Sequence, residues 1–291
     1  MLDKRDPPLA EGLEDMLSLH VLAFYWEGFE PRLDCHDPFN HEVVQVGFDP
    51  ADFVVSGRKV CVGRFEGDRY IECPGRTPVT KFSQCDKCAG EAFIDDQECI
   101  FDPKCDGSKC DNEFCKRQHV LYLAFYDTMA KIGMSSTRRV ERRLVEQGAD
   151  AFAIIGAFPN RLAAREGEKE ISAQLELPQW IKQQTILSRF SHPLDTDGLR
   201  ERYDGLKRVL GETRGLSVEP LRRLDDYPLR RPLPEAPVLQ DTAGVHIGRF
   251  IGVKGKWLVY DSRGLKALNL SDLPARFLAD KYLVQSLKTN K

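Results

Sequence analysis

The cysteines are the residues of this sequence whose spacing most directly suggests chemistry. Nine occur in the chain, and seven of them fall between Cys73 and Cys115. Cys85 and Cys88 form a C-x-x-C pair, a spacing that lets two thiolates reach one ion. An odd, clustered set in a chain without a recognisable export signal argues against a disulfide framework and for bound metal. We therefore predict a zinc-binding segment.

Structural zinc is tetrahedral, so the C-x-x-C pair needs two further ligands. Cys73 is the expected third ligand and Cys99 the expected fourth, with Cys61 as the rival for that position. The rest of the region predicts a second site with three thiolates and one imidazole, formed by Cys105, Cys110, Cys115 and His119. Four protein ligands leave no open position for water, so each zinc ion, whether one or two are bound, is expected to be structural.

Composition limits what kind of protein this can be. Its 291 residues are 42% hydrophobic and 30% charged, the balance of a globular protein with one or two domains. The formal net charge is −3, so any nucleic-acid surface must be a local patch. No apolar run approaches the ~20 residues that span a bilayer, and the N-terminus lacks a signal-peptide core. We expect a cytoplasmic protein without a membrane partner.

The apolar pattern predicts an α+β fold around residues 119–180. Strands at 119–126 and 130–134 precede a helix that stops at Gly148, a third apolar strand and a second helix, in the order β-β-α-β-α. Ser135, Ser136 or Thr137 is expected to cap the first helix, and Asn160 the second. Around this core we expect an N-terminal arm (1–41) with a short helix over 11–24, a flanking small β barrel or sheet (42–72 and 236–291), a Cys-rich zinc insert (73–118) and a helical and linker segment (181–235).

Charged side chains on the two core helices suggest phosphate chemistry. Glu168 falls in the apolar stripe with Ala164 and Ile171, where an unpaired carboxylate is costly, so a metal ion or an arginine should partner it. Guanidinium groups donate bidentately and suit phosphate. The helices carry a local basic patch, for which the alternative interpretation is a solvated face, made of Arg138, Arg139, Arg142, Arg143, Arg161 and Arg165.

The flanking β regions mix basic and aromatic residues. Lys254, Lys256 and Trp257 stand close together near the C-terminus, and Phe65 and Phe250 lie in neighbouring strand-like segments. Single-stranded nucleic acid is bound by such mixtures, because bases stack on rings while charges follow the phosphates. The alternative interpretation is that these aromatic residues belong to the core.

Short motifs run through the core in a fixed order. Tyr122 is followed by Lys131-Ile132-Gly133, then by Arg143-Leu144-Val145-Glu146-Gln147-Gly148-Ala149, then by Arg161 and Glu168. Downstream lies Gly252-Val253-Lys254-Gly255-Lys256-Trp257-Leu258. This set resembles the GIY-YIG nuclease superfamily and, more closely, the domain-of-unknown-function family 2797, over roughly residues 42–275.

The resemblance implies a GIY-YIG-like core with a nuclease constellation. In it, Tyr122 serves as general base or orients the attacking water, Arg143 stabilises charge on the phosphate, and Glu168 holds one Mg²⁺ ion. Lys131 stands where the superfamily has its second tyrosine. It can contact phosphate as a point charge, or take over proton chemistry if its pKa falls.

Two main classes of function follow. The first is a metal-dependent endonuclease or RNA-processing enzyme that uses these residues. The second is a non-catalytic binding protein, acting on RNA or the ribosome, that keeps the fold and its phosphate-binding surface. A zinc-dependent protein-interaction module is a third class if the arginines are merely solvated. We expect nucleic acid to be the partner, RNA favoured over DNA, and leave cleavage open.

Overall fold

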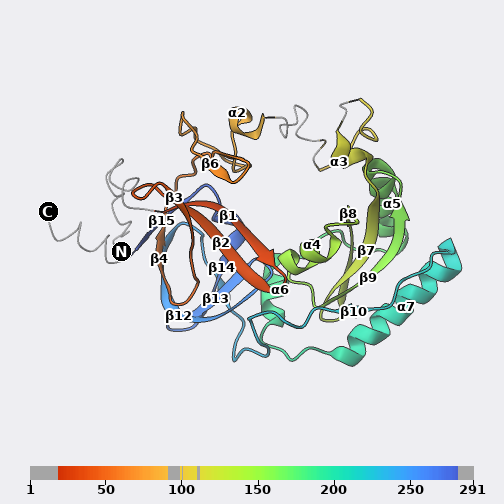
Figure 1. The fold of residues 1–291 in the computed structure, drawn as a ribbon. Helices are drawn as coiled ribbons and strands as arrows, with labels where there is room; N and C mark the ends of the chain where they lie inside the picture. The colour runs from red at the N-terminus through yellow and green to blue at the C-terminus, as the bar shows by residue number, and fades with distance from the viewer. Residues whose placement is uncertain (1–18, 91–98, 100, 110–111, 281–291) are drawn as a thin grey trace, which may run out of the picture.

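Two sheets organise the part of the chain that the computed structural model describes, which is residues 19–90, 99, 101–109 and 112–280 (Figure 1). The larger sheet has nine strands in the order β11-β14-β13-β12-β4-β15-β1-β2-β3, and the smaller has four in the order β10-β9-β7-β8. The fold is therefore mixed α+β, with more sheet than helix. No helix among the described residues combines the length and the apolar character needed to cross a bilayer.

The nine-stranded sheet brings distant parts of the sequence together. Its β4 pairs antiparallel with β12, so the two flanking regions expected to be β-rich meet in one sheet. The strand bounds are β1 (Leu19–Glu27), β2 (Glu30–Asp37), β3 (Glu42–Gln45), β4 (Ala51–Val55), β11 (Val238–Leu239), β12 (Gly244–Lys254), β13 (Trp257–Asp261), β14 (Leu265–Asn269) and β15 (Phe277–Asp280). A short 3-10 helix, η3 (Leu270–Asp272), follows β14.

The N-terminal arm differs from its prediction. The helix expected over 11–24 is wrong from residue 19 onward, where β1 pairs with both β2 and β15; residues 11–18 lie outside the described part. Val21 and Trp26 of β1 are buried. Aromatic and β-branched residues favour strands, and a strand from the far end of the chain supplies the second pairing edge, which local sequence cannot reveal.

The chain around the four-stranded sheet follows the expected β-β-α-β-α order. In sequence these elements are β7 (His119–Tyr126), β8 (Met129–Ser136), α4 (Val140–Gln147), β9 (Ala151–Phe158) and α5 (Arg161–Gln174). The two-residue β10 (Arg222–Arg223) is the fourth strand of the sheet. Asn160 caps α5 as predicted, its Oδ1 accepting a hydrogen bond from the Ala163 N–H at 2.9 Å. The predicted cap of α4 is wrong, because Arg139 is the N-cap residue and offers no side-chain acceptor.

The two faces of this sheet pack against different partners. Leu121, Leu123 and Phe125 face a core shared with α5 and with α7 (Thr196–Arg214). Tyr122 and Tyr126 face α4 and a second core that continues into the nine-stranded sheet. Strand β8 forms one edge, so side chains from both faces can meet beside it (Figure 1).

A close backbone contact joins α4 to the nine-stranded sheet. Gly148 ends α4 at φ 76°, and Gly255 forms the β12–β13 turn at φ 58°. A Cβ placed on Gly255 would lie 2.5 Å from the Gly148 nitrogen. Both motif glycines are therefore needed for the same reason, since each leaves room for the other's backbone.

A buried ion-pair network lies beside that contact. Asp150 Oδ1 is 2.9 Å from Lys254 Nζ and 3.1 Å from Arg231 Nη2, and its Oδ2 accepts a hydrogen bond from the Asp127 N–H at 2.7 Å. Asp150 and Lys254 are both buried. Arg231 belongs to the segment expected to be helix and linker (181–235). Tyr227 of the same segment packs into the core, where its hydroxyl donates to the Ala149 carbonyl at 3.1 Å.

The described parts of the Cys-rich segment, residues 73–90, 99, 101–109 and 112–118, lie above the two sheets in Figure 1, and the helices within these parts are short. They include α2 (Asp86–Ala89) and α3 (Glu113–Lys116), and the hairpin of β5 (Arg64–Glu66) and β6 (Arg69–Ile71) precedes them. A further helix, α6 (Gln183–Arg189), connects the α5 region to α7.

The glycine contact yields a prediction about stability. Gly255→Ala should lower the free energy of unfolding by about 3 kcal/mol, because the added methyl group meets backbone that cannot rotate away. Gly28→Ala is the matched control, since Gly28 has a similar φ of 56° and a Cβ added to it would meet nothing within 4 Å. The control should lose only about 1–2 kcal/mol, the cost of a left-handed alanine. Urea denaturation measures both, and equal losses would show that the Gly148 contact contributes nothing.

Candidate functional site

Four cysteine thiols converge in one cluster. The Sγ atoms of Cys61, Cys73, Cys85 and Cys88 all lie within 4.8 Å of one another, and each residue is less than a tenth exposed. Sulfurs about 2.3 Å from a common tetrahedral ion lie roughly 3.8 Å apart, and the Cys73 and Cys85 sulfurs are separated by 4.0 Å. The donor set and its spacing therefore fit a metal ion such as zinc.

The fourth member corrects the predicted ligand set. It is Cys61, the rival candidate, and not Cys99, whose carbonyl instead accepts a hydrogen bond from Arg161 at 3.1 Å. Cys61 lies outside the Cys-rich run, just before the β5–β6 hairpin, and the Cys85 N–H points at its sulfur from 3.2 Å. Cys61 is farther from the C-x-x-C pair in sequence than Cys99 is. The β5–β6 hairpin reverses the chain after Cys61, and Cys61 is the cysteine that lies beside the pair in space.

Hydrogen bonds favour a thiolate at one position of the cluster. Burial acts to raise the pKa of Cys73, but hydrogen bonds from Thr77, Gly75 and Cys88 together outweigh it and lower that pKa to about 6. Burial raises the pKa of Cys61 and of Cys88. A cation bound by all four sulfurs would supply the charge that keeps the remaining thiols deprotonated.

The second predicted metal site stays a prediction. Cys110 lies outside the described residues, and Cys105, Cys115 and His119 do not form a metal-ligand cluster within the described part of the chain. Arg161 donates to the Cys115 sulfur at 3.6 Å, and His119 Nδ1 lies 2.8 Å from the Arg117 carbonyl. The structure thus places a guanidinium group beside one of the three expected thiolates.

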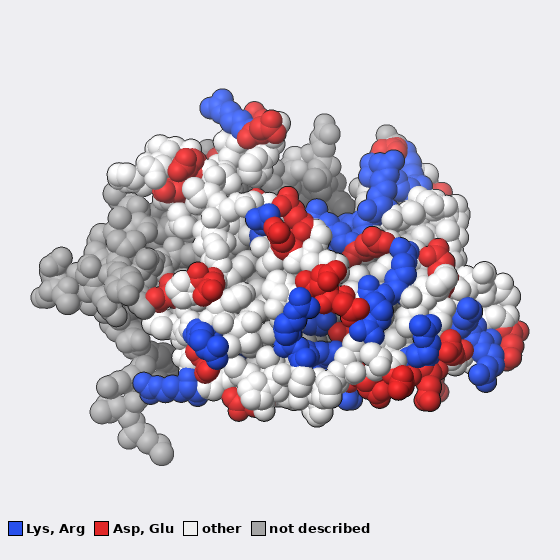
Figure 2. Space-filling model, turned by 60° about the horizontal axis from the view of Figure 1, so that its bottom comes forward, with Lys and Arg blue, Asp and Glu red and all other residues white. Residues whose placement is uncertain are grey.

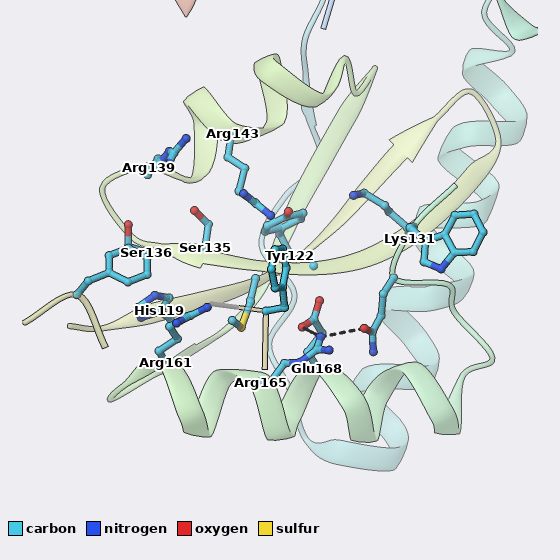
Figure 3. Close-up of a pocket in the computed structure, with 16 residues that line it drawn as sticks. His119, Tyr122, Lys131, Ser135, Ser136, Arg139, Arg143, Arg161, Arg165 and Glu168 are labelled. Atoms are coloured by element: carbon cyan, nitrogen blue, oxygen red, sulfur yellow. Dashed lines mark hydrogen bonds and ion pairs between the residues drawn. The ribbon is translucent and has the colours of Figure 1, made fainter. Parts of the chain in front are cut away.

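A separate pocket of about 570 Å³ lies along the edge strand β8. It brings together all four residues predicted to form a catalytic constellation. Arg143 reaches it from α4 on one side of β7 and β8, Glu168 from α5 on the other, and Tyr122 and Lys131 from the strands between (Figure 3). The lining also includes His119, Ser135, Ser136, Arg139, Arg161, Arg165 and Gln179.

Tyr122 is fixed by the strand pairing. It sits opposite Gly133 in the β7–β8 ladder, and a Cβ on Gly133 would lie 2.6 Å from the tyrosine hydroxyl oxygen. The ring therefore lies directly over the glycine backbone. This explains the glycine of the Lys-Ile-Gly motif physically, since any side chain there would push the ring out of the pocket.

Arg143 carries a buried donor without a partner. Its Nε is shielded from solvent and makes no hydrogen bond within the described structure. The side chain points toward Tyr122 in the pocket (Figure 3). A buried unpaired guanidinium N–H costs free energy, and an anion in the pocket would satisfy it.

Lys131 adds a second buried cation. It is 9% exposed, and burial, followed by repulsion from Arg143, lowers its pKa to about 8, although Glu168 opposes the shift. Arg143 and Lys131 thus face the same cavity, and the negative charge of Glu168 offsets their two positive charges only in part.

Glu168 is buried and has the arginine partner that was one of its two predicted alternatives. Its Oε2 lies 2.6 Å from Arg165 Nη1. Arg165 also contacts Asp102, at 3.2 Å from its Nε, and donates to Gln179 Oε1 at 2.8 Å. A divalent cation at Glu168 would therefore compete with an existing charge-assisted hydrogen bond.

Several residues predicted to contact nucleic acid lie outside the pocket. The prediction is wrong for Lys254 and Trp257, because Lys254 is buried against Asp150 and Trp257 is fully buried in the core. Lys256 is partly buried, with its Nζ 5.0 Å from the Trp257 ring centroid. Arg142 is exposed and pairs with Glu146 at 3.0 Å, and Arg138 is exposed outside the pocket lining.

Arg161 lines the pocket and also contacts the Cys-rich segment. It is buried rather than surface-exposed, and it binds the Cys-rich segment through Cys99 and Cys115. Its guanidinium carbon also lies 5.5 Å from the centroid of the Phe114 ring. These contacts join the Cys-rich segment to the start of α5 at one end of the pocket, and whether Arg161 binds nucleic acid stays a prediction.

Three aromatic residues of the pocket were missed by sequence reasoning. Phe101, Phe114 and Trp180 line it and are 55%, 43% and 67% exposed. Phe101 and Phe114 lie among the cysteines, where no helical or strand periodicity singles them out. Trp180 lies in the short segment after α5. Its position in the string Pro178-Gln179-Trp180, a large aromatic residue beside turn-forming and polar residues, is a sequence signal for exposure.

One face of the molecule carries mixed charge. On the face in Figure 2, basic and acidic side chains are interspersed, and no broad area of one sign forms. This agrees with the net charge of −3.

These features define an α+β protein with a four-thiol cluster suited to a metal ion and a separate cationic pocket at a sheet edge. The chain belongs to the family described as "Protein of unknown function (DUF2797)", whose model matches residues 51–274. In the same comparisons, no curated protein and no solved structure matched it.

The thiol cluster yields a prediction about metal content. Purified protein should carry zinc at close to one ion per cluster, and Cys61→Ser should lose it because the tetrahedral set is then incomplete. Cys99→Ser is the matched control and should keep that ion. Elemental analysis of the three proteins measures this; loss in the control with retention in Cys61→Ser would restore the original ligand assignment.

The buried lysine yields a prediction about pH. Its folded-state pKa of about 8 lies below the usual 10.5, so protonated Lys131 destabilises the fold at pH below about 8, and this penalty fades as pH rises toward 10.5. Lys131→Met should therefore raise the free energy of unfolding by about 2–3 kcal/mol at pH 7 and by much less at pH 10.

The control for that measurement is Lys182→Met. Lys182 is exposed at the start of α6, and its replacement should change stability by no more than about 0.5 kcal/mol at either pH. Denaturant unfolding at both pH values provides the data. A gain from Lys131→Met that does not depend on pH would show that the charge on Lys131 is not the cause.

Proposed function

We propose that this protein binds nucleic acid by placing a backbone phosphate in the β8 pocket, and that RNA is the preferred partner. The observation that carries the proposal is the buried, unpaired Nε of Arg143 in a cavity that it shares with Lys131. A phosphate group has the charge and the acceptor oxygens that both groups lack.

The pocket also has uncharged groups of the kind that can hydrogen-bond a ribose hydroxyl. Ser135 and Ser136 contribute hydroxyls and Gln179 an amide to the lining. Hydroxyls and amides can hydrogen-bond a 2′-hydroxyl, which only RNA offers. This supports RNA over DNA, whether free or in an assembly such as the ribosome.

The relation to GIY-YIG nucleases is part of the same proposal. Its support is the β-β-α-β-α order and the convergence of Tyr122, Arg143 and Glu168 on one pocket. The thiol cluster then serves as a structural zinc site, away from the phosphate. In this interpretation the family retains the phosphate-binding surface of a nuclease core.

Binding can be tested with one pair of arginine variants. Arg143→Ala should weaken binding of a fluorescent RNA by at least about tenfold, because a charge-assisted contact to phosphate is lost. Arg138→Ala is the control, since Arg138 lies near the N-terminal end of α4 but not in the pocket. Anisotropy titrations at several salt concentrations measure affinity, and the slope of log affinity against log salt should be smaller for Arg143→Ala than for wild type. Equal losses in both variants would contradict the proposed site.

Phosphodiester hydrolysis is a second candidate function. It is favoured by the positions of Tyr122 and Glu168 on either side of the same cavity, where a carboxylate-held Mg²⁺ ion would supply a Lewis acid. The Arg165–Glu168 pair competes with such an ion, so binding without cleavage remains our first proposal.

Cleavage can be tested separately from binding. Labelled RNA is incubated with protein in Mg²⁺ or EDTA and its length is followed by gel electrophoresis. The hydrolase proposal expects shortening in Mg²⁺ alone and a loss of at least about a hundredfold in Glu168→Gln. Intact RNA in wild type, or equal cleavage by Glu168→Gln, would exclude this candidate while leaving the binding proposal in place.

A further inference from the structure

Large aromatic side chains on the rim of the β8 pocket are exposed to an unusual degree. Trp180 is 67% exposed, Phe101 55% and Phe114 43%, and all three line the cavity that holds Arg143 and Lys131. Exposed aromatic surface is costly for a folded chain, and its gathering beside a cationic cavity indicates a ligand with both apolar faces and negative charge.

Two of these rings lie at opposite ends of strand β8. Phe114 packs against His119, with ring centroids 5.2 Å apart, and His119 pairs with Ser136 at the end of β8. Trp180 also lines a smaller cavity with Met129 and Ala130, at the start of β8. The eight residues of the strand extend roughly 23 Å, so the pocket is the middle of a groove with a ring near each end.

Neighbouring contacts hold the rings in place. The Arg161 guanidinium lies 5.5 Å from the centroid of Phe114, and the Lys81 ammonium lies 4.2 Å from the centroid of Phe101. On the other side, the Ile132 N–H donates to the Pro178 carbonyl at 3.1 Å, and Gln179 accepts from Arg165. The segment that bears Trp180 is thus tied to both β8 and α5.

We propose that this groove binds a single strand of RNA along β8, with unpaired bases stacked on Trp180 and Phe114 and one of the intervening phosphates held by Arg143. The inference rests on the proposed function and names its substrate class. Stacking on a protein ring needs a base whose face is free, which a duplex does not present. Every base has such a face, so the groove tolerates different sequences.

The three tryptophans of the chain provide a direct readout. Trp26 is 2% exposed and Trp257 fully buried, so changes in tryptophan fluorescence on binding report mainly on Trp180. An unstructured eight-nucleotide RNA should quench this fluorescence, and a blunt RNA duplex of the same length should not. Trp180→Ala, at an exposed position that the fold does not need, should bind the single strand about tenfold more weakly. Trp180→Phe should recover most of the loss, because it restores a stacking surface.

A probe without bases separates this inference from the binding proposal. Inorganic tripolyphosphate should bind Trp180→Ala as well as wild type, and Arg143→Ala more weakly. If Arg143→Ala weakens RNA binding while Trp180→Ala binds single strand and duplex like wild type, the stacking inference is overturned and phosphate binding stands. If Arg143→Ala has no effect on RNA or tripolyphosphate, the proposed function itself fails.

Discussion

The contact of Asp150 with Lys254 and Arg231 is the interaction on which the relative placement of the two sheets depends. One carboxylate follows α4, while its cationic partners come from β12 and from the segment before β11. All three are nearly excluded from water, and burial lowers the pKa of Lys254 even though Asp150 favours its charged form. Removal of Asp150 would leave two buried cations without this carboxylate partner, and breaking a buried pair typically costs about 3–5 kcal/mol. The network therefore favours a single docking geometry, which the Gly148–Gly255 backbone contact also requires.

That geometry has consequences for the pocket. Helix α4 ends at the Asp150 network and begins near the pocket, so fixing its C-terminal end also fixes the direction in which Arg143 points. Partners compensate the cations at the junction. At the pocket, Arg143 and Lys131 face each other without full compensation, and burial lowers the pKa of Lys131. The fold thus pairs its buried charges at the junction but leaves the Arg143 Nε without a hydrogen-bond partner among the described residues, and a bound anion would satisfy this donor.

The sequence predicted what depends on local patterns and missed what depends on chain crossings. The β-β-α-β-α order, the Asn160 cap and the Gly148 stop follow from neighbouring residues, and the structure has all three. Lys254 looked like a phosphate contact because no local pattern shows Asp150 opposite it. Sequence spacing favours Cys99 over Cys61 for a similar reason. Cys61 is far from the C-x-x-C pair along the chain, and only the folded hairpin shows that the two lie close in space.

The Cys-rich segment connects the thiol cluster with the groove. Lys81 and Phe101 lie on either side of the knuckle in sequence, and Lys81 Nζ contacts the Phe101 ring at 4.2 Å. Farther along, Cys115 and Phe114 both contact Arg161 at the start of α5. A metal ion that cross-links four thiols would restrict the described parts of this segment, whose helices are short. Its effect on the pocket would then be indirect, because two of the aromatic rings at the rim come from this segment while the charged groups come from other elements.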